Sequence, residues 1–280
     1  MKTSLRDPHE TTNFEAYVEQ YCAERELASR LRDARPDDRR RLYSVVYDEF
    51  YRRFPQPIGS GQDEVVRQMA FLRRFLRRGL TFVEIGPGDC SLSFAVAPFV
   101  STVYAVDVSE EFIRTGNRPP NFQFVPWDGM RLPLGQASAD LVYSHQVIEH
   151  LHPDDGLLHL QLIQEILIPE GQYICLTPNR LNGPHDISKH FDSVASGLHL
   201  KEYTTTELAK MFTMAGFTNI RAYCGGRGLY IGVPITLLRI METFLARLRP
   251  PLRRTLGNSR LCRALLGIRL VGQKPGGISK

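Results

Sequence analysis

Residues 81–90 read TFVEIGPGDC, and this stretch decides the fold. Its apolar first half predicts a short buried strand, which Gly86 and Gly88 then end. Glycine suits a sharp turn that brings backbone close to a ligand, because it has no Cβ. Residues 91–95, SLSFA, predict a helix. A strand, a glycine turn and a helix in this order indicate the start of a nucleotide-binding α/β unit.

The turn departs from the dinucleotide-binding fingerprint, because Ser91 stands where a third glycine is expected. Glu84 lies two residues before the first glycine, and Asp107 follows the next predicted strand. This combination resembles motif I and the ribose-binding acid of the class I S-adenosylmethionine-dependent methyltransferases. The resemblance implies an α/β fold with a Rossmann-like seven-stranded sheet whose last strand is antiparallel. It also implies S-adenosyl-L-methionine as the cofactor.

Composition bounds the remaining possibilities. An apolar fraction of 42% can fill a core, so a disordered chain is not expected. Residues 1–7 lack the apolar core of a secretory signal, and no apolar run reaches the about 20 residues that span a membrane. Five scattered cysteines fit reduced thiols. The sequence therefore predicts a cytoplasmic protein, and the net charge of +5 leaves a peripheral contact with an anionic membrane open.

Hydrophobic periodicity divides the chain into four segments. Residues 1–61 are expected to form an N-terminal helical cap, and residues 62–228 the cofactor-binding core. Residues 229–266 are expected to form a basic amphipathic helical insertion, and residues 267–280 the final strand and tail. Helices are predicted at 14–31, 36–54, 63–78 and 205–215, and strands at 82–85, 103–106, 122–125, 139–144, 171–177, 220–224 and 268–274.

In an open parallel sheet, ligands bind beyond the carboxyl ends of the strands. After the first strand, the Gly86-Pro87-Gly88 turn and the following helix N-terminus suit the carboxylate of a methionine moiety. Glu84 is expected either to contact the ligand or to brace this turn. After the second strand, Asp107, followed by Val108, is expected to accept hydrogen bonds from ribose hydroxyls. The alternative for Asp107 is a helix N-cap.

Two further strand ends complete the predicted cofactor site. After the third strand, Asp128 and Gly129 stand where the family often has an acid that accepts from the adenine amino group. The alternative for this pair is a simple Asp-Gly turn. Ser144, at the end of the fourth strand, is assigned to the same site.

Residues 143–151, YSHQVIEHL, resemble the Glu-His-Leu type of motif IV region found in small-molecule methyltransferases. The stretch lacks both the Asn/Asp-Pro-Pro-aromatic signature of enzymes that methylate exocyclic amines and a Pro-Cys nucleophile. Both absences oppose a nucleic-acid substrate. His145 is a candidate general base, with a polar wall residue as the alternative, whereas His150 is expected to be a buried structural histidine.

The polar segment 177–191 is a long loop after the fifth strand, and such loops tend to be functional. It resembles loops of bacterial small-molecule and glycan-cluster methyltransferases. His185 and Asp186 are candidates for a catalytic base or for contacts with a substrate hydroxyl. The spacing of His185, His190 and His199 matches no zinc or iron template, so no metal site is predicted.

Residues 236–270 contain eight arginines and one acid, Glu242. Leu237, Leu238, Met241, Leu245 and Leu248 predict the apolar stripe of a helix. Such a basic amphipathic segment suits an anionic membrane surface or a lipid-linked substrate. Two alternatives are a cap over the substrate pocket and a helix packed on its own sheet.

The resemblance implies an SN2 methyl transfer from S-adenosylmethionine to a small-molecule acceptor. A hydroxyl acceptor on a natural product, glycan or lipid-linked molecule is favoured, because it gives the loop histidines a role. The alternatives are a nucleic-acid methyltransferase, an NAD-dependent oxidoreductase and a non-catalytic Rossmann-like binding protein. The missing third glycine and Glu84 oppose the oxidoreductase. The retained glycine turn and Asp107 oppose a protein that has lost its cofactor.

Overall fold

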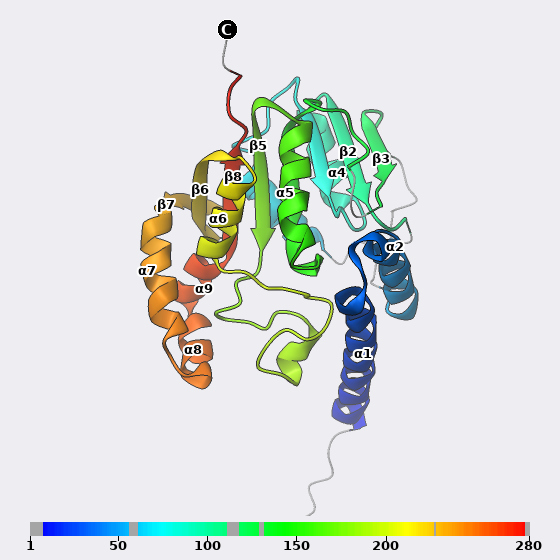
Figure 1. Ribbon diagram of the computed structural model, residues 1–280, viewed down its shortest axis with the longest axis vertical. Helices are drawn as coiled ribbons and strands as arrows, with labels where there is room; N and C mark the ends of the chain where they lie inside the picture. The colour runs from blue at the N-terminus through cyan, green and yellow to red at the C-terminus, as the bar shows by residue number, and fades with distance from the viewer. Residues whose placement is uncertain (1–7, 56–60, 111–117, 129–131, 227, 278–280) are drawn as a thin grey trace, which may run out of the picture.

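A mixed sheet forms the centre of the computed structural model, which describes residues 8–55, 61–110, 118–128, 132–226 and 228–277 (Figure 1). Within these residues the sheet has eight strands in the order β3-β2-β1-β4-β5-β8-β6-β7. The strands are β1 (Thr81–Ile85), β2 (Thr102–Asp107), β3 (Phe122–Pro126), β4 (Ala139–His145), β5 (Leu167–Thr177), β6 (Thr218–Gly226), β7 (Leu229–Val233) and β8 (Ile268–Gln273).

The order and directions of the strands confirm the predicted Rossmann-like methyltransferase sheet. Strands β1 to β5 pair in parallel, and β8 inserts antiparallel between β5 and β6. The described sheet has one strand more than predicted, because residues 229–233 form the edge strand β7. Gly225 and Gly228 have φ of +135° and +87°, conformations that L side chains rarely adopt, and they permit the hairpin from β6 to β7.

Helices cover both faces of the sheet. The helices are α1 (Pro8–Asp33), α2 (Pro36–Arg53), α3 (Gln62–Leu72), α4 (Ser91–Val96), α5 (Asp155–Ile166), α6 (Thr205–Met214), α7 (Ile235–Ala246), α8 (Pro250–Gly257) and α9 (Arg260–Leu266). Helices α5 and α6 pack on one face, and α3 and α4 on the other (Figure 1). The third helix ends at Leu72, earlier than the predicted Arg78, because the chain turns over residues 73–79.

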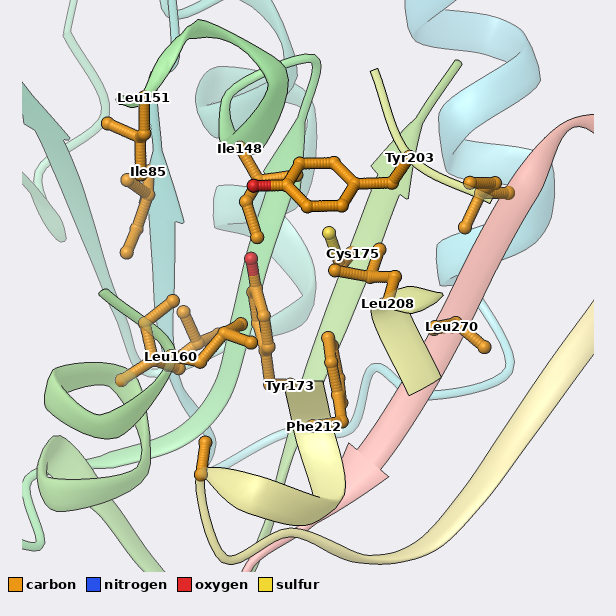
Figure 2. Packing of buried hydrophobic residues seen from close by; sticks show 14 of the residues in the cluster. Ile85, Ile148, Leu151, Leu160, Tyr173, Cys175, Tyr203, Leu208, Phe212 and Leu270 are labelled. Atoms are coloured by element: carbon orange, nitrogen blue, oxygen red, sulfur yellow. The ribbon is translucent and has the colours of Figure 1, made fainter. Parts of the chain in front are cut away.

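The core on the α5–α6 face is built around Tyr173 of β5 (Figure 2). Its ring stacks on Phe212 of α6, with 5.3 Å between the ring centroids. Leu160 of α5 and Leu208 of α6 are fully buried beside it. Alternate residues of each strand reach opposite faces, so Val83 joins this cluster whereas Phe82 joins the opposite one.

A buried ion pair docks α2 onto the start of α5. Arg39 donates to both oxygens of Asp155, at 2.8 and 2.7 Å, and the Tyr43 hydroxyl donates to Asp155 at 2.8 Å. Arg39 is only 2% exposed, although arginine is mostly found on protein surfaces. The bidentate pair explains the difference, because a buried guanidinium requires a partner of this kind.

Glu242 anchors α7 to the core. This buried carboxylate accepts from Asn179 Nδ2 (2.9 Å) and from the backbone N–H groups of Thr205 and Thr206 (2.7 and 3.0 Å). It therefore occupies the N-terminus of α6, where four N–H groups lack helical partners. Among the described residues, no helix combines the length and apolar character that a membrane crossing requires.

Candidate active site

A pocket of about 720 Å³ lies at the carboxyl ends of β1, β2 and β4. Helices α1 and α2 form one side, and the loop between β5 and α6 forms another. Figure 1 shows these segments together below the parallel strands. The sequence therefore brings the strand ends, the N-terminal helices and the long loop to one pocket.

The glycine turn exposes backbone to this pocket through Gly86 and Gly88. Gly86 has φ of +67°, and its N–H donates to the carbonyl of Val106 at 2.9 Å. A Cβ at Gly86 would lie 2.5 Å from Cγ2 of Val147, so a larger residue would displace that side chain. The turn thus leaves the close backbone approach that a bound cofactor requires.

Asp107, at the end of β2, lines the same pocket together with Val108. Its Oδ1 accepts from the N–H groups of Val108 (2.7 Å) and Ser109 (3.3 Å). Burial raises the pKa of Asp107 to about 6, although these hydrogen bonds oppose the rise. Above that pH the oriented carboxylate is suited to accept from the hydroxyls of a ribose.

Three predicted cofactor residues, Glu84, Pro87 and Ser144, lie behind the lining of this pocket. Buried Glu84 accepts from the Ser93 hydroxyl at 2.6 Å, and burial raises its pKa to about 8. The Ser144 hydroxyl is 2.7 Å from the hydroxyl of Tyr173. The contacts of Glu84 and Ser144 hold the turn and the end of β4 in place.

Asp128 lies beside the pocket, after β3. Its Oδ2 forms an ion pair with Nη2 of Arg40 on α2, at 2.6 Å. The preceding residue, Trp127, lines the pocket. Gly129 lies outside the described residues.

His145, at the end of β4, also lines the pocket. Gln68 donates from Nε2 to His145 Nδ1 (2.9 Å), because Gln68 Oε1 accepts from the Tyr143 hydroxyl (3.0 Å). The proton of the neutral imidazole is then on Nε2, 3.8 Å from Oε1 of Glu64. Burial lowers the pKa of His145. This network favours a polar wall residue over a general base.

His185 enters the pocket from the loop between β5 and α6. Its Nε2 lies 3.1 Å from the carbonyl oxygen of Asn179 and 3.2 Å from Oδ1 of Asn182. Both partners are acceptors, so Nε2 carries the proton and the Nδ1 lone pair is left to accept one. The backbone N–H of His185 donates to Glu202 at 2.7 Å and fixes its position.

Asp186 lines the pocket too, but its oxygens bind the loop itself. Oδ1 accepts from the N–H of Ser188 (3.1 Å) and from its hydroxyl. Oδ2 accepts from the N–H of Gly197 (2.8 Å). Asp186 thereby caps the short 3₁₀ helix η3 (Ile187–His190), and these contacts give it a structural function.

Aromatic side chains of α1 and α2 complete the pocket. Tyr17 stacks on His190 of the loop, with ring centroids 4.8 Å apart. Tyr43, Tyr47 and Tyr51 of α2 also line the pocket. The N-terminal helices therefore supply wall residues and also hold the loop.

Two buried polar residues near the pocket, Gln68 and Glu149, were not predicted as parts of the site. Gln68 lies three residues after Val65 and four before Leu72, on the apolar stripe of α3. A polar residue on such a stripe signals a buried partner, which is His145. Glu149 is fully buried close to the buried Ile148 and Leu151. A charged residue in such a buried stretch likewise indicates a buried polar partner.

Comparison with known proteins finds a family model that matches part of the core. Residues 83–175 match the family described as "Methyltransferase domain". A probable S-adenosylmethionine-dependent methyltransferase of Mycobacterium tuberculosis is 30% identical over 144 residues, covering 51% of this chain and 50% of the relative. One from Mycolicibacterium smegmatis is 29% identical over 140 residues, covering 50% and 52%. The chain thus spans about half the length of these curated relatives.

Solved structures show the same fold at low identity. A phosphoethanolamine N-methyltransferase of Haemonchus contortus, with phosphoethanolamine and S-adenosylhomocysteine, aligns with a TM-score of 0.57 and 14% identity, over 87% of this chain and 50% of that one. The [4+2]-cyclase SpnF aligns with a TM-score of 0.50 and 15% identity, over 75% and 80%. Since one of these is a cyclase, the fold by itself does not fix the reaction.

Proposed function

We propose that this chain, which carries a class I S-adenosylmethionine-dependent methyltransferase domain, methylates a hydroxyl group of a small-molecule or lipid-linked acceptor. One observation carries the proposal. The pocket that contains the glycine turn and Asp107 also contains His185, whose Nδ1 is left to accept a proton.

The residues around the glycine turn suit the methyl donor. Backbone at Gly86 and Gly88 receives its methionine portion, and the Asp107 carboxylate binds its ribose. Asp128 is assigned to the adenine, with Trp127 beside it. When bound, the donor supplies a methyl group on sulfur, and transfer to the acceptor oxygen breaks the carbon–sulfur bond and leaves a neutral thioether.

His185 acts as the base in this proposal. The acceptor hydroxyl gives its proton to Nδ1 as the new oxygen–carbon bond forms, and the opposite Nε2–H stays on the carbonyl of Asn179. Asp186 holds the loop that carries His185, and His145 stays a neutral wall residue. The aromatic wall from α2 excludes water and aligns the acceptor.

Calorimetric titration with S-adenosylhomocysteine and with NAD tests the cofactor assignment. Binding of the first and not the second is expected, and Asp107→Ala should weaken it by at least about 100-fold, since hydrogen bonds to a charged group contribute about 1.5–3 kcal/mol each. NAD binding without S-adenosylhomocysteine binding overturns the assignment. Ser109→Ala, next to Asp107, serves as the control and should bind nearly as wild type.

The base is tested with labelled S-adenosylmethionine and a panel of hydroxylated lipids and glycosides. With any acceptor that becomes labelled, His185→Ala should lower kcat by about 100-fold or more and leave S-adenosylhomocysteine affinity unchanged. His190→Phe, which keeps the aromatic ring that stacks on Tyr17, is the matched control. Equal rates for His185→Ala and wild type would show that another group takes the proton.

We infer a contact with anionic membranes from the outer face of α7. Leu237, Ile240 and Phe244 lie on one stripe of this helix and are 57%, 67% and 60% exposed. Arg239 and Arg247 flank the stripe. Of the predicted apolar stripe, Leu238 and Leu245 pack inward, whereas Leu237 is exposed. An exposed apolar stripe between arginines matches the acyl chains and phosphates of an anionic bilayer.

Vesicle flotation tests this contact. The protein should float with vesicles that contain phosphatidylglycerol, and Leu237→Ser/Phe244→Ser should abolish flotation. Val66→Ser, an exposed apolar residue of α3, is the matched control and should float as wild type. Equal flotation of the double variant, or none by the wild type, removes the membrane from the proposal and leaves the methyl transfer untouched.

A further inference from the structure

Three potential metal ligands meet beside the pocket: Glu149, His150 and His199. Glu149 and His150 belong to the 3₁₀ helix η2 (Ile148–His150) after β4, and His199 to the loop before α6. One oxygen or nitrogen atom from each lies within 4.8 Å of the others. His199 is distant in sequence from the adjacent Glu149 and His150, which is why histidine spacing did not reveal the cluster.

The two imidazoles are oriented as metal ligands usually are. His150 donates from Nδ1 to the carbonyl of Leu198, at 3.0 Å, because a carbonyl can only accept. His199 Nδ1 lies 2.8 Å from Oε1 of Glu202, which likewise accepts. Each Nε2 therefore carries the lone pair when the ring is neutral. A carbonyl or carboxylate on the far nitrogen is the typical support of a metal-binding histidine.

Glu149 supplies an oxygen that the described residues leave without a hydrogen bond. Its Oε2 accepts from the Thr177 hydroxyl at 2.9 Å, whereas Oε1 is buried and has no partner among them. Leaving a buried acceptor unsatisfied costs about 1–3 kcal/mol, and more for a charged group. A cation at Oε1 would remove that penalty.

The charge around the cluster also favours a cation. Glu202 contacts His199 directly, and Glu149, Asp186 and Glu24 also interact with it electrostatically. Arg32 contributes a positive charge near these four carboxylates, and its guanidinium donates to the carbonyls of Ser196 and Gly197. A divalent ion would balance part of this negative charge.

We propose that Glu149 Oε1, His150 Nε2 and His199 Nε2 bind one divalent transition-metal ion, with Zn²⁺ the best match to two imidazoles and a carboxylate. Bonds of about 2.1 Å in a tetrahedral site place ligand atoms about 3.4 Å apart, so small side-chain rotations close the site. His150 and His199 both line the pocket, which leaves a fourth position open toward the acceptor. A metal there polarises an acceptor oxygen as a Lewis acid.

Metal binding is measured on the full chain after chelator treatment and desalting, with no methyl donor present. Titration with Zn²⁺ against a fluorescent chelator should give one ion per chain, and Co²⁺ should show the visible absorption of a tetrahedral site. His199→Ala and Glu149→Gln should each weaken Zn²⁺ binding by at least about 100-fold. Glu202→Gln, which removes the charged support of His199, should weaken it by about 10- to 100-fold.

His190→Phe removes a pocket imidazole outside the triad but keeps the ring that stacks on Tyr17, and it should bind Zn²⁺ as wild type. Circular dichroism checks the fold, and if His199→Ala does not fold, the nearly isosteric Glu149→Gln decides. Less than one ion per wild-type chain, or equal affinity in Glu149→Gln, overturns the proposal. Because no donor or acceptor takes part, that result leaves the proposed methyl transfer standing.

Discussion

Burial opposes the ionisation of the Asp107 carboxyl group, whereas hydrogen bonds from backbone N–H groups favour it. The N–H groups of Val108 and Ser109 hold its Oδ1, yet its pKa is still raised to about 6. The acid therefore titrates just below neutral pH. That property makes its function measurable without knowledge of the acceptor.

S-adenosylhomocysteine affinity should be constant above about pH 7 and should fall by up to about tenfold per pH unit below pH 6. The sign follows because acid protonates Asp107, and the protonated form accepts hydrogen bonds from ribose less well. Calorimetry across pH 5 to 8 measures this effect. Asp107→Asn should bind weakly at every pH and show a flat profile; a profile as steep as that of wild type would assign the titration to another group.

Burial of Glu84 makes the stability of the fold depend on pH. Its pKa is raised to about 8, so folding favours the protonated form while the unfolded chain is ionised above its ordinary value near 4.5. Stability is therefore lost as pH rises from about 4.5 to 8, by up to about 1.4 kcal/mol for each step of one in pH. Glu84→Gln should raise the free energy of unfolding at pH 8 by about 3 kcal/mol, and by little at pH 5. Urea denaturation at both pH values measures the difference, and equal gains would contradict a raised pKa.

At the scale of elements, α2 depends on one buried ion pair. The guanidinium of Arg39 has both oxygens of Asp155 as partners, and the Tyr43 hydroxyl shares one of them. Tyr43 also accepts from the N–H of His152, so the same contact fixes the chain between η2 and α5. Helix α2 and its pocket tyrosines are thereby held against the sheet.

Asp155→Asn should lower the free energy of unfolding by about 3–5 kcal/mol, because it leaves the Arg39 charge buried without an ionic partner. Asp154→Asn is the matched control. Asp154 is 4.0 Å from the same guanidinium but 74% exposed, so a change below about 1 kcal/mol is expected. Denaturant unfolding of both variants measures the contrast. Similar losses in the two variants would show that the buried geometry is not what stabilises α2.

Much of the element layout could be predicted, because buried strands and amphipathic helices leave periodic patterns. The strands of the core and the helices at 36–53 and 205–214 were predicted within a few residues. Strand β7 was not predicted. Its exposed positions hold apolar Leu229 and Ile231, so the sequence does not alternate between apolar and polar residues as in a typical half-buried strand. Burial of Arg39 was also missed, because its partner lies 116 residues away.

At the scale of the molecule, the pocket joins segments that the sequence keeps apart. Gly86 and Asp107 were found through local motifs, since each follows a recognisable strand. No local sequence motif indicates that Glu149 lies close to His199, because this proximity depends on how the loop after β5 folds back. Placement of the candidate site was therefore predictable from motifs, whereas partners across the pocket required the fold.

The net charge of +5 predicts a salt effect on the whole protein. Arg239, Arg247 and Arg249 are exposed around the apolar stripe of α7. Raising ionic strength from about 0.1 to 1 M shortens the screening length from about 10 to 3 Å. Flotation with anionic vesicles should fall by at least about tenfold, whereas S-adenosylhomocysteine affinity should change less than about twofold. Salt-independent flotation would mean that apolar insertion alone holds the protein on the bilayer.

Strand β8 has a consequence for synthesis. It lies between β5 and β6, yet it follows every other described strand in the chain. On the ribosome, β5 and β6 therefore emerge with open edges, and the exposed leucines of α7 to α9 emerge before the strand that joins them. Until β8 is translated, the nascent chain exposes both unpaired strand edges and apolar helix surfaces. We expect it to need chaperone protection until β8 has emerged, and a chain truncated before Ile268 to aggregate.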